Sequence, residues 1–258
     1  MTFLASDIIE RFYMFLWPML RISALMLTAP PFSSSVFNLR VRTTVALALA
    51  WMIYPLYKWP VIDPLSAVGL VEVFNQVVIG ASMGLVLQVV VAALVLAGHA
   101  ISAAMGLTMS SMIDPSVGNV PILSQFLIVL STLIFVGTGG HAMVLGLVLE
   151  SFRWLPIGQS LLNQDVYGLM VRWSSMIFLG GLLLALPVMV SLLFINIGLG
   201  VVTRAAPSLN IFALGFPAMI IAGFLILLLS MDSIGARISW LWVQGFSTLR
   251  VLLGAPDG

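Results

Sequence analysis

Two histidines, His99 and His141, are the side chains in this sequence best suited to metal binding or to proton transfer near neutral pH. A zinc site needs three or four ligands, and no third ligand stands at a suitable spacing from either histidine. The chain has no cysteine, which excludes disulfides, thiolate catalysis and cysteine-ligated metals. No H-E-x-x-H motif occurs either. We therefore expect no enzyme, no metal and no cofactor.

Arg21 differs from the other charged residues in its position, because it lies inside the apolar stretch LWPMLRISALML. An arginine at the centre of a bilayer costs about 3 kcal/mol on insertion scales. Its side chain could snorkel or pair with a neighbouring helix, or it could contact a partner subunit or a polar conduit. The sequence leaves both interpretations open. Glu72, with Asn75 and Gln76, marks the start of a later apolar segment.

The stretch GLTMSSMIDPSVGNVP, residues 106–121, separates two long uncharged runs and contains one carboxylate, Asp114. Asp114 precedes Pro115, which disfavours helix at that point, and its side chain can cap a turn. Gly106 and Gly118 permit backbone conformations that other residues avoid. A plain turn is the simplest interpretation of Asp114, but the methionines beside it suggest a further role for the loop.

The amino-acid composition predicts whether this protein lies in water or in a membrane. The chain has 258 residues, of which 61% are hydrophobic and only 7% are charged, and its mean hydropathy is +1.18. A soluble domain carries about 25% charged residues, because its surface must be solvated. The net charge of +1 gives no support to nucleic-acid binding. We therefore predict an integral membrane protein that crosses the bilayer several times.

Long apolar segments predict an all-α fold, since a span needs about 20 apolar residues. A last stretch, 238–253, could lie as a helix at a surface. The distribution of Lys and Arg between the loops does not determine the orientation in the membrane. We treat residues 1–258 as one membrane domain, with apolar segments at about 12–32, 45–57, 73–105, 122–149, 174–202 and 209–231.

Small residues recur at helical spacing, which in lipid lets helix backbones approach closely. They are Gly80 and Gly84, then Gly98, Ser102 and Gly106, and further on Gly180–Gly181 and Gly198–Gly200.

Prolines are expected to interrupt the apolar helices of the C-terminal half, because each removes a backbone donor. They are Pro187, Pro207 and Pro217. Arg204, Pro207 and Asn210 together indicate a reversal between two helices. The paired apolar runs on either side therefore predict helical hairpins.

The stretch LGVVTRAAPSLNIFALGFP resembles the hallmark of the FliR family, the flagellar member of the type III secretion export gate. Further matches follow the same order along the chain: LRISALMLTAPPF with RVR, AGHAISAAMGL, the loop 106–121, GGHAMVL and SFRWLPIG. The resemblance covers residues from about 21 to 228. The chain departs from the usual family pattern at Asn38, His99, Ala104, Met109 and Met112.

The resemblance implies a single-copy subunit that assembles with FliP- and FliQ-like membrane proteins into the portal through which unfolded flagellar proteins leave the cytoplasm. It also implies an FlhB-like switch protein as a partner, contact with membrane lipid, and a place in the flagellar basal body at the bacterial inner membrane. Much of the assembled gate would stand above the bilayer plane, towards the periplasm. The related SctT subunit of the virulence injectisome is one alternative, and a small-molecule transporter with broken helices is another.

In this family the loop that matches residues 106–121 acts as a plug in the channel. The resemblance implies that Met109, Met112 and Ile113 form the apolar constriction, beside Ser110 and Ser111. An apolar constriction excludes water and ions by dewetting, and methionine is deformable enough to seal an irregular gap. The loop geometry is assigned to Gly106, Asp114, Pro115, Gly118 and Pro121. The family motif assigns structural or partner contacts to Arg21, Arg42, Arg204, Pro207, Asn210, Phe212, Gly215, Phe216 and Pro217.

Overall fold

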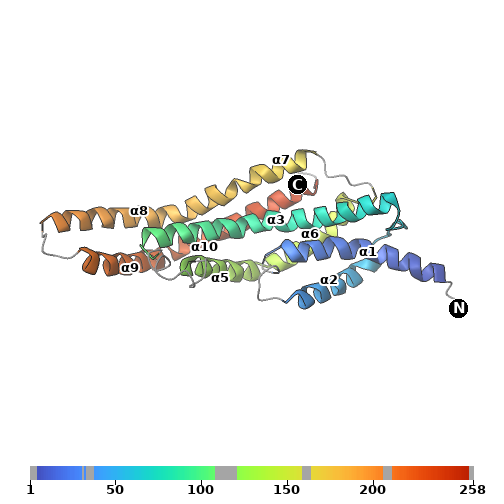
Figure 1. The fold of residues 1–258 in the computed structure, drawn as a ribbon, viewed down its shortest axis with the longest axis horizontal. Helices are drawn as coiled ribbons and strands as arrows, with labels where there is room; N and C mark the ends of the chain where they lie inside the picture. Colours follow the sequence, from blue (N-terminus) through green and yellow to red (C-terminus); the bar gives the residue numbers. More distant parts are fainter. Residues whose placement is uncertain are drawn as a thin grey trace. The chain divides into compact units, whose positions relative to one another are not determined.

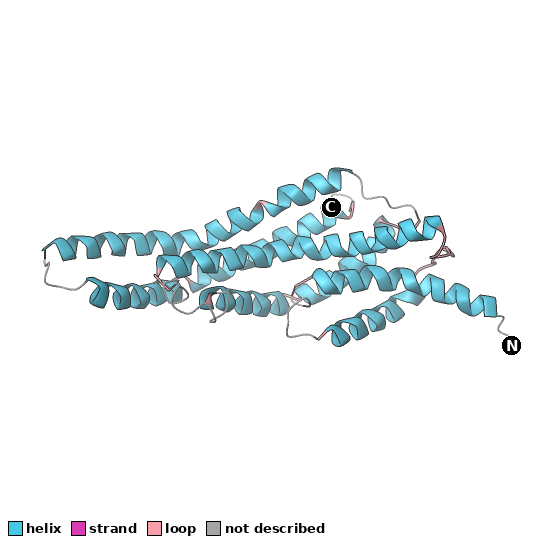
Figure 2. Cartoon of the chain, in the orientation of Figure 1, coloured by secondary structure: helices cyan, strands magenta, loops and turns pink. Residues whose placement is uncertain are grey.

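The computed structural model describes residues 5–30, 32, 38–107, 121–158, 164–205 and 211–255. Helices account for nearly all regular structure in these ranges, and they contain no strand (Figure 2). This confirms the predicted all-α fold class. The α-helices are α1 (Ala5–Thr28), α2 (Leu39–Ile53), α3 (Ala67–Ala104), α5 (Ile122–Gly137), α6 (Gly140–Trp154), α7 (Gln164–Ser174), α8 (Met176–Ala205), α9 (Ile211–Leu229) and α10 (Met231–Leu252) (Figure 1). A short 3₁₀ helix, η1 (Tyr54–Leu56), follows α2.

The chain divides into two compact units, which we describe separately. Unit 1 contains residues 1–89, 139–174 and 244–258, and unit 2 contains residues 90–138 and 175–243. In unit 1, α1 packs against α2, and the two run side by side in Figure 1. In unit 2, α8 packs against α9 as a hairpin.

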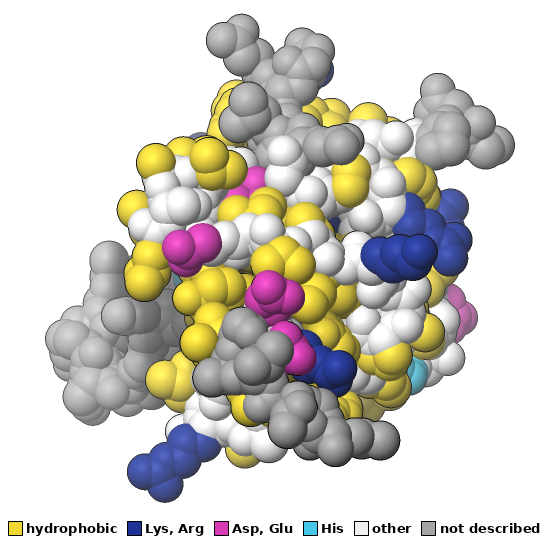
Figure 3. All heavy atoms as spheres, turned by 90° about the vertical axis from the view of Figure 1, so that its right-hand side faces the viewer, with side chains coloured by type: hydrophobic (Ala, Val, Ile, Leu, Met, Phe, Trp, Pro, Cys, Tyr) yellow, Lys and Arg dark blue, Asp and Glu magenta, His cyan; other side chains and the backbone are white. Residues whose placement is uncertain are grey.

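Two helical stretches of the described chain are long and apolar enough to cross a membrane, namely residues 67–104 in α3 and residues 166–205, which combine α7 and α8. The number rises to four if each of two interrupted helix pairs, α5 with α6 and α9 with α10, is counted as one span. Large apolar side chains also remain at the surface: Trp51 is 73% exposed, and Phe178 and Phe194 are each 70% exposed. One face of the molecule shows hydrophobic side chains between scattered charges (Figure 3). Such a surface suits lipid or apolar protein better than water.

Glycines determine where the helices of each unit approach most closely. In unit 1 a side-chain carbon at Gly80 would overlap the carbonyl oxygen of Arg21, and one at Gly84 would overlap the side chain of Thr28. In unit 2 a carbon at Gly98 would overlap the backbone of Ser124. The predicted role of these small residues in helix packing is therefore confirmed. Gly198 and Gly200, in contrast, have open space around them within the described chain.

The stretch from Gly80 to Gly84 also has the G-x-S-x-G spacing of a hydrolase nucleophile elbow. That elbow requires a sharp turn from a strand into a helix, whereas α3 runs continuously through this stretch. Ser82 is buried within the helix, with only 4% of its surface exposed. The motif therefore belongs to helix packing.

Two features of the helices differ from the simplest interpretation of the sequence. The apolar segment 122–149 is divided between α5 and α6, and Gly139 has a left-handed backbone at the division, with φ of 75°. Pro187 and Pro217 lie inside α8 and α9, which continue past them instead of ending. Each proline removes one backbone hydrogen bond, and the remaining bonds on either side carry the helix through.

Candidate functional site

Helix α3 ends just before the predicted plug loop. The backbone amide of Leu107 donates to the carbonyl oxygen of Ser102 at 2.9 Å, and that of Gly106 donates to Ala103 at 3.0 Å. Gly106 has a φ of 77°. These two bonds and the left-handed glycine form a Schellman motif, which satisfies the last carbonyl groups of a helix. The role predicted for Gly106 in loop geometry thus has a local physical basis.

The first turn of α5 packs against α3 near the C-terminal end of α3. The hydroxyl of Ser124 donates to the carbonyl oxygen of Val95 at 3.0 Å and lies 3.3 Å from Nδ1 of His99. Nδ1 of His99 also lies 2.9 Å from the same carbonyl oxygen. Because Gly98 has no side chain, the backbones of the two helices meet directly at Ser124. Pro121, the last residue assigned to the loop, occupies the N-cap position of α5.

Helix α9 completes this frame around the end of α3. The ring of Phe216 lies 3.3 Å from the point where a side-chain carbon of Gly106 would stand. The buried side chain of Met105 packs against Gly223, where an added carbon would lie 2.5 Å from Met105 Cε. We call this arrangement of α3, α5 and α9 around Gly106 the loop frame. It brings Gly106 together with Phe216, two residues that the sequence placed in separate motifs.

Most of the predicted plug falls outside the described residues. These positions are Met109, Ser110, Ser111, Met112, Ile113, Asp114, Pro115 and Gly118. The assignment of the first five to the plug, and of the last three to the geometry of the loop, therefore stays a prediction.

The C-terminal motif is described in part. Arg204 is exposed in the last turn of α8, and Pro207 and Asn210 lie outside the described residues. Phe212 lies in the first turn of α9, though its side chain is not among those described. Gly215, Phe216 and Pro217 follow in the same helix, and Phe216 reaches the loop frame.

Arg42 lies in the first turn of α2, where it is half-buried. The helix begins at Asn38, whose side chain accepts a hydrogen bond from the backbone amide of Arg40 at 3.5 Å. Asparagine is a favourable N-cap residue. The departure from the family pattern at Asn38 therefore leaves the helix start intact.

Arg21 forms the centre of a second site, in unit 1, where its side chain is fully buried. Its Nε donates to Oε1 of Gln76 at 2.7 Å, its Nη1 to the hydroxyl of Ser151 at 3.0 Å, and its Nη2 to the carbonyl oxygen of Leu155 at 2.8 Å. One guanidinium thereby joins α1 to α3 and to the end of α6. Such charge-assisted bonds compensate the burial of the cation.

The negative charge that faces Arg21 comes from Glu72, through Gln76. The amide nitrogen of Gln76 donates to Oε1 of Glu72 at 2.5 Å, while its oxygen accepts from Arg21. Arginine only donates and a carboxylate only accepts, so this orientation of the amide is the one that satisfies both partners. Glu72 and Gln76 are both buried. The sequence analysis missed this relay, which the spacing of four residues between Glu72 and Gln76 could have indicated. Nothing in the sequence indicated Ser151 or Leu155.

The histidines do not form a metal site within the described chain. No group of three or more His, Cys, Asp or Glu residues there could hold a metal ion. His99 instead takes part in the contact between α3 and α5, and His141 is exposed near the start of α6. Asn196 lines a cavity of about 290 Å³ in unit 2, together with Ala104 and residues of α8.

Comparison with known proteins identifies close relatives over nearly the whole chain. Residues 12–244 match the family of bacterial export proteins, family 1. A protein of Escherichia coli K12 is 33% identical over 241 residues, which cover 93% of this chain and 92% of the relative. A protein of Pectobacterium carotovorum is 32% identical over 98% of this chain and 97% of its own length. One from Bacillus subtilis is 27% identical over 96% of this chain and 97% of its own length. All three are named flagellar biosynthetic protein FliR.

Proposed function

Because this chain belongs to the FliR family of bacterial export proteins, we propose that it is a non-enzymatic subunit of the flagellar type III secretion export gate. Together with FliP- and FliQ-like proteins it forms the portal for unfolded flagellar proteins in the cell membrane. Family membership and the long apolar helices support a membrane component of the export apparatus. The flagellar names of the relatives favour a flagellar role over the injectisome.

The chain also closes this portal with an apolar plug in the loop 106–121. Met109, Met112 and Ile113 supply side chains that exclude water and ions from a narrow passage. Methionine has no branched carbon and adapts its shape, so the same residues can yield to a passing polypeptide. Ser110 and Ser111 separate the apolar residues and add no bulk.

The loop frame is the observation that carries this proposal. A plug must be held firmly at its base if its tip is to return to the same position after each export event. Gly106 ends α3 with a Schellman motif, and Ser124 fixes the start of α5 to α3. Both ends of the loop are therefore anchored to one pair of helices in unit 2.

Ion conductance of the assembled complex tests the plug. We expect deletion of residues 110–113 to raise the conductance of the closed complex in a planar bilayer, because the apolar constriction is lost. Deletion of residues 159–162, which also connect two helices, is the matched control and should leave conductance unchanged.

Substitutions that keep the length of the loop separate its chemistry from its size. Replacing both Met109 and Met112 by serine should also raise conductance, since polar side chains hydrate the passage. Replacing Ser110 and Ser111 by alanine in the same loop should not. Equal conductance of the wild type, the deletion and the double serine variant would refute the plug.

A further inference from the structure

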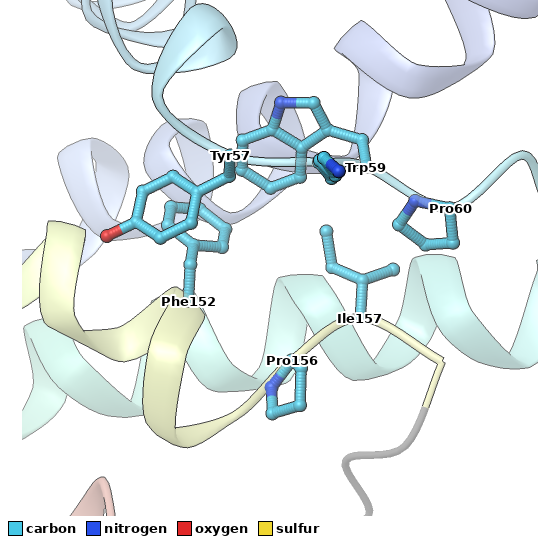
Figure 4. Close-up of a pocket in the computed structure, with 7 residues that line it drawn as sticks. Tyr57, Trp59, Pro60, Phe152, Pro156 and Ile157 are labelled. Carbon is cyan, nitrogen blue, oxygen red and sulfur yellow. The ribbon is translucent and has the colours of Figure 1, made fainter.

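A surface pocket of about 400 Å³ lies within unit 1, and none of its lining residues belongs to the loop frame. One wall comes from the connection that follows η1, and the other comes from the end of α6 and the connection after it (Figure 4). Gly158 in the second connection approaches Ile62 in the first, since an added carbon would lie 3.4 Å from Ile62 Cδ1. The pocket is lined by Tyr57, Lys58, Trp59, Pro60, Phe152, Pro156 and Ile157.

The aromatic walls of the pocket are fixed by hydrogen bonds made elsewhere. The hydroxyl of Tyr57 donates to the carbonyl oxygen of Leu149 at 2.8 Å, and Nε1 of Trp59 donates to that of Tyr54 at 2.7 Å. The ring of Trp59 packs edge-on against Phe152, with centroids 5.1 Å apart. The polar atoms of both rings are therefore occupied within the protein. They leave carbon surfaces to a ligand.

Arg21 contacts the wall of the pocket formed by Phe152 and Pro156. It donates to the carbonyl oxygen of Leu155, directly before Pro156, and its guanidinium carbon lies 4.2 Å from the centre of the Phe152 ring. Arg21 is fully buried and so does not face the pocket opening. Among the described lining residues the exposed cation is Lys58, which is also the only lysine in the sequence.

The backbone and the side chains of this region fit the surface of a membrane better than its hydrocarbon core. Residues 57–66 follow η1 and precede α3 without forming helix or strand. Irregular backbone that faces lipid is not stable in the hydrocarbon core, where its polar groups lack partners. Tryptophan and tyrosine are enriched at the level of the lipid headgroups, and lysine extends towards water there. Leu56, Val61 and Leu65, in and beside this stretch, are 62%, 56% and 81% exposed. The combination suits the boundary between headgroups and acyl chains.

We propose that this pocket binds the headgroup of an anionic phospholipid. Lys58 pairs with the phosphate, the rings of Tyr57 and Trp59 contact the glycerol region, and the exposed apolar side chains beside the pocket contact the acyl chains. The pocket volume lies within the range of small-ligand sites, about 300–1,000 Å³. A lysine near an anionic lipid surface strengthens binding about fivefold.

The single lysine makes the test specific. The full-length protein is placed in nanodiscs of phosphatidylglycerol or of phosphatidylcholine and treated with an amine-acylating reagent, and acylation of Lys58 is measured by peptide mass spectrometry. We expect acylation to be about fivefold slower in phosphatidylglycerol. The α-amino group of Met1 is the internal reference, and its acylation should change less than that of Lys58. Inorganic phosphate added to phosphatidylcholine nanodiscs should give no protection.

Two variants, each with a matched control, test whether the lipid binds in this pocket. Pro156→Trp fills the pocket and should abolish the difference between the lipids, whereas Pro55→Trp, at an exposed proline outside the pocket, should keep it. Lys58→Gln should lower the phosphatidylglycerol retained by the protein in native mass spectrometry about fivefold. The exposed Arg153→Gln in the same unit should not.

Four results would overturn the proposal. They are equal acylation of Lys58 in the two lipids, undiminished protection in Pro156→Trp, protection by inorganic phosphate alone, and protection that requires a copurified protein and is equal in both lipids. The third result would indicate a site for free anions, and the fourth a site for a protein partner.

Discussion

At the scale of single residues, the guanidinium of Arg21 donates to three acceptors on two other parts of unit 1, namely α3 and the end of α6. Gln76 connects it to the buried carboxylate of Glu72. The hydroxyl of Ser151 donates a hydrogen bond to the carbonyl oxygen of Val148 at 2.7 Å, so its oxygen can accept one from Arg21. Removing the guanidinium would leave several buried polar groups without partners, which costs more than the loss of the bonds themselves.

We expect Arg21→Met to destabilise the protein by about 3 kcal/mol or more, because it also leaves the charge of Glu72 buried and unbalanced. Thermal unfolding in detergent, followed by circular dichroism, measures the effect. Arg153→Met is the matched control, since Arg153 is exposed on α6 in the same unit. If the two variants unfold at the same temperature, Arg21 does not hold the unit together.

The sequence revealed the importance of Arg21 but not its partners. A cation inside an apolar stretch indicates a partner of some kind, whereas Glu72, Asn75 and Gln76 were interpreted only as the start of a later apolar segment. Ser151 and the carbonyl group of Leu155 are too common in type to be recognised before the fold is known. The choice between an internal and an external partner therefore depended on the way α1 packs against α3 and α6.

At the scale of helices, small residues determine which pairs of backbones touch. The contact between Gly98 and Ser124 joins α3 to α5, and that between Gly80 and Arg21 joins α3 to α1. The same spacing at Gly198 and Gly200 leads to no contact within the described chain. The pattern thus predicts where a close approach is allowed, while the three-dimensional arrangement decides whether it occurs.

We predict that Gly98→Ala destabilises the protein by about 1–3 kcal/mol, because the added carbon overlaps the backbone of Ser124. Gly200→Ala is the matched control: its methyl group enters open space, and alanine favours helix over glycine by up to about 1 kcal/mol. Thermal unfolding of both variants under the same conditions measures the difference. A Gly98→Ala protein as stable as Gly200→Ala would show that α3 and α5 do not meet as described.

Helix positions were largely predictable, since apolar stretches of sufficient length have few alternatives in a membrane. The division between α5 and α6 was missed because the apolar character continues across it, although Gly137, Gly139 and Gly140 were a visible signal. The effect of Pro187 and Pro217 was overestimated, because one missing hydrogen bond bends or weakens a helix without ending it.

At the scale of the whole molecule, the chain exposes more apolar surface than a soluble protein tolerates. On α8, Phe178, Leu193 and Phe194 are 70%, 57% and 70% exposed, and no charged residue occurs between Arg172 and Arg204. These side chains require lipid or apolar protein around them. The composition made this predictable without a structure.

The proposal that this chain works as one subunit of an export gate is tested most directly by coexpressing it with the FliP- and FliQ-like proteins of the same organism and measuring the purified assembly by native mass spectrometry. We predict one defined complex that contains a single copy of this chain and several copies of each partner. A chain that purifies folded and stable by itself, with neither partner retained, would contradict the account.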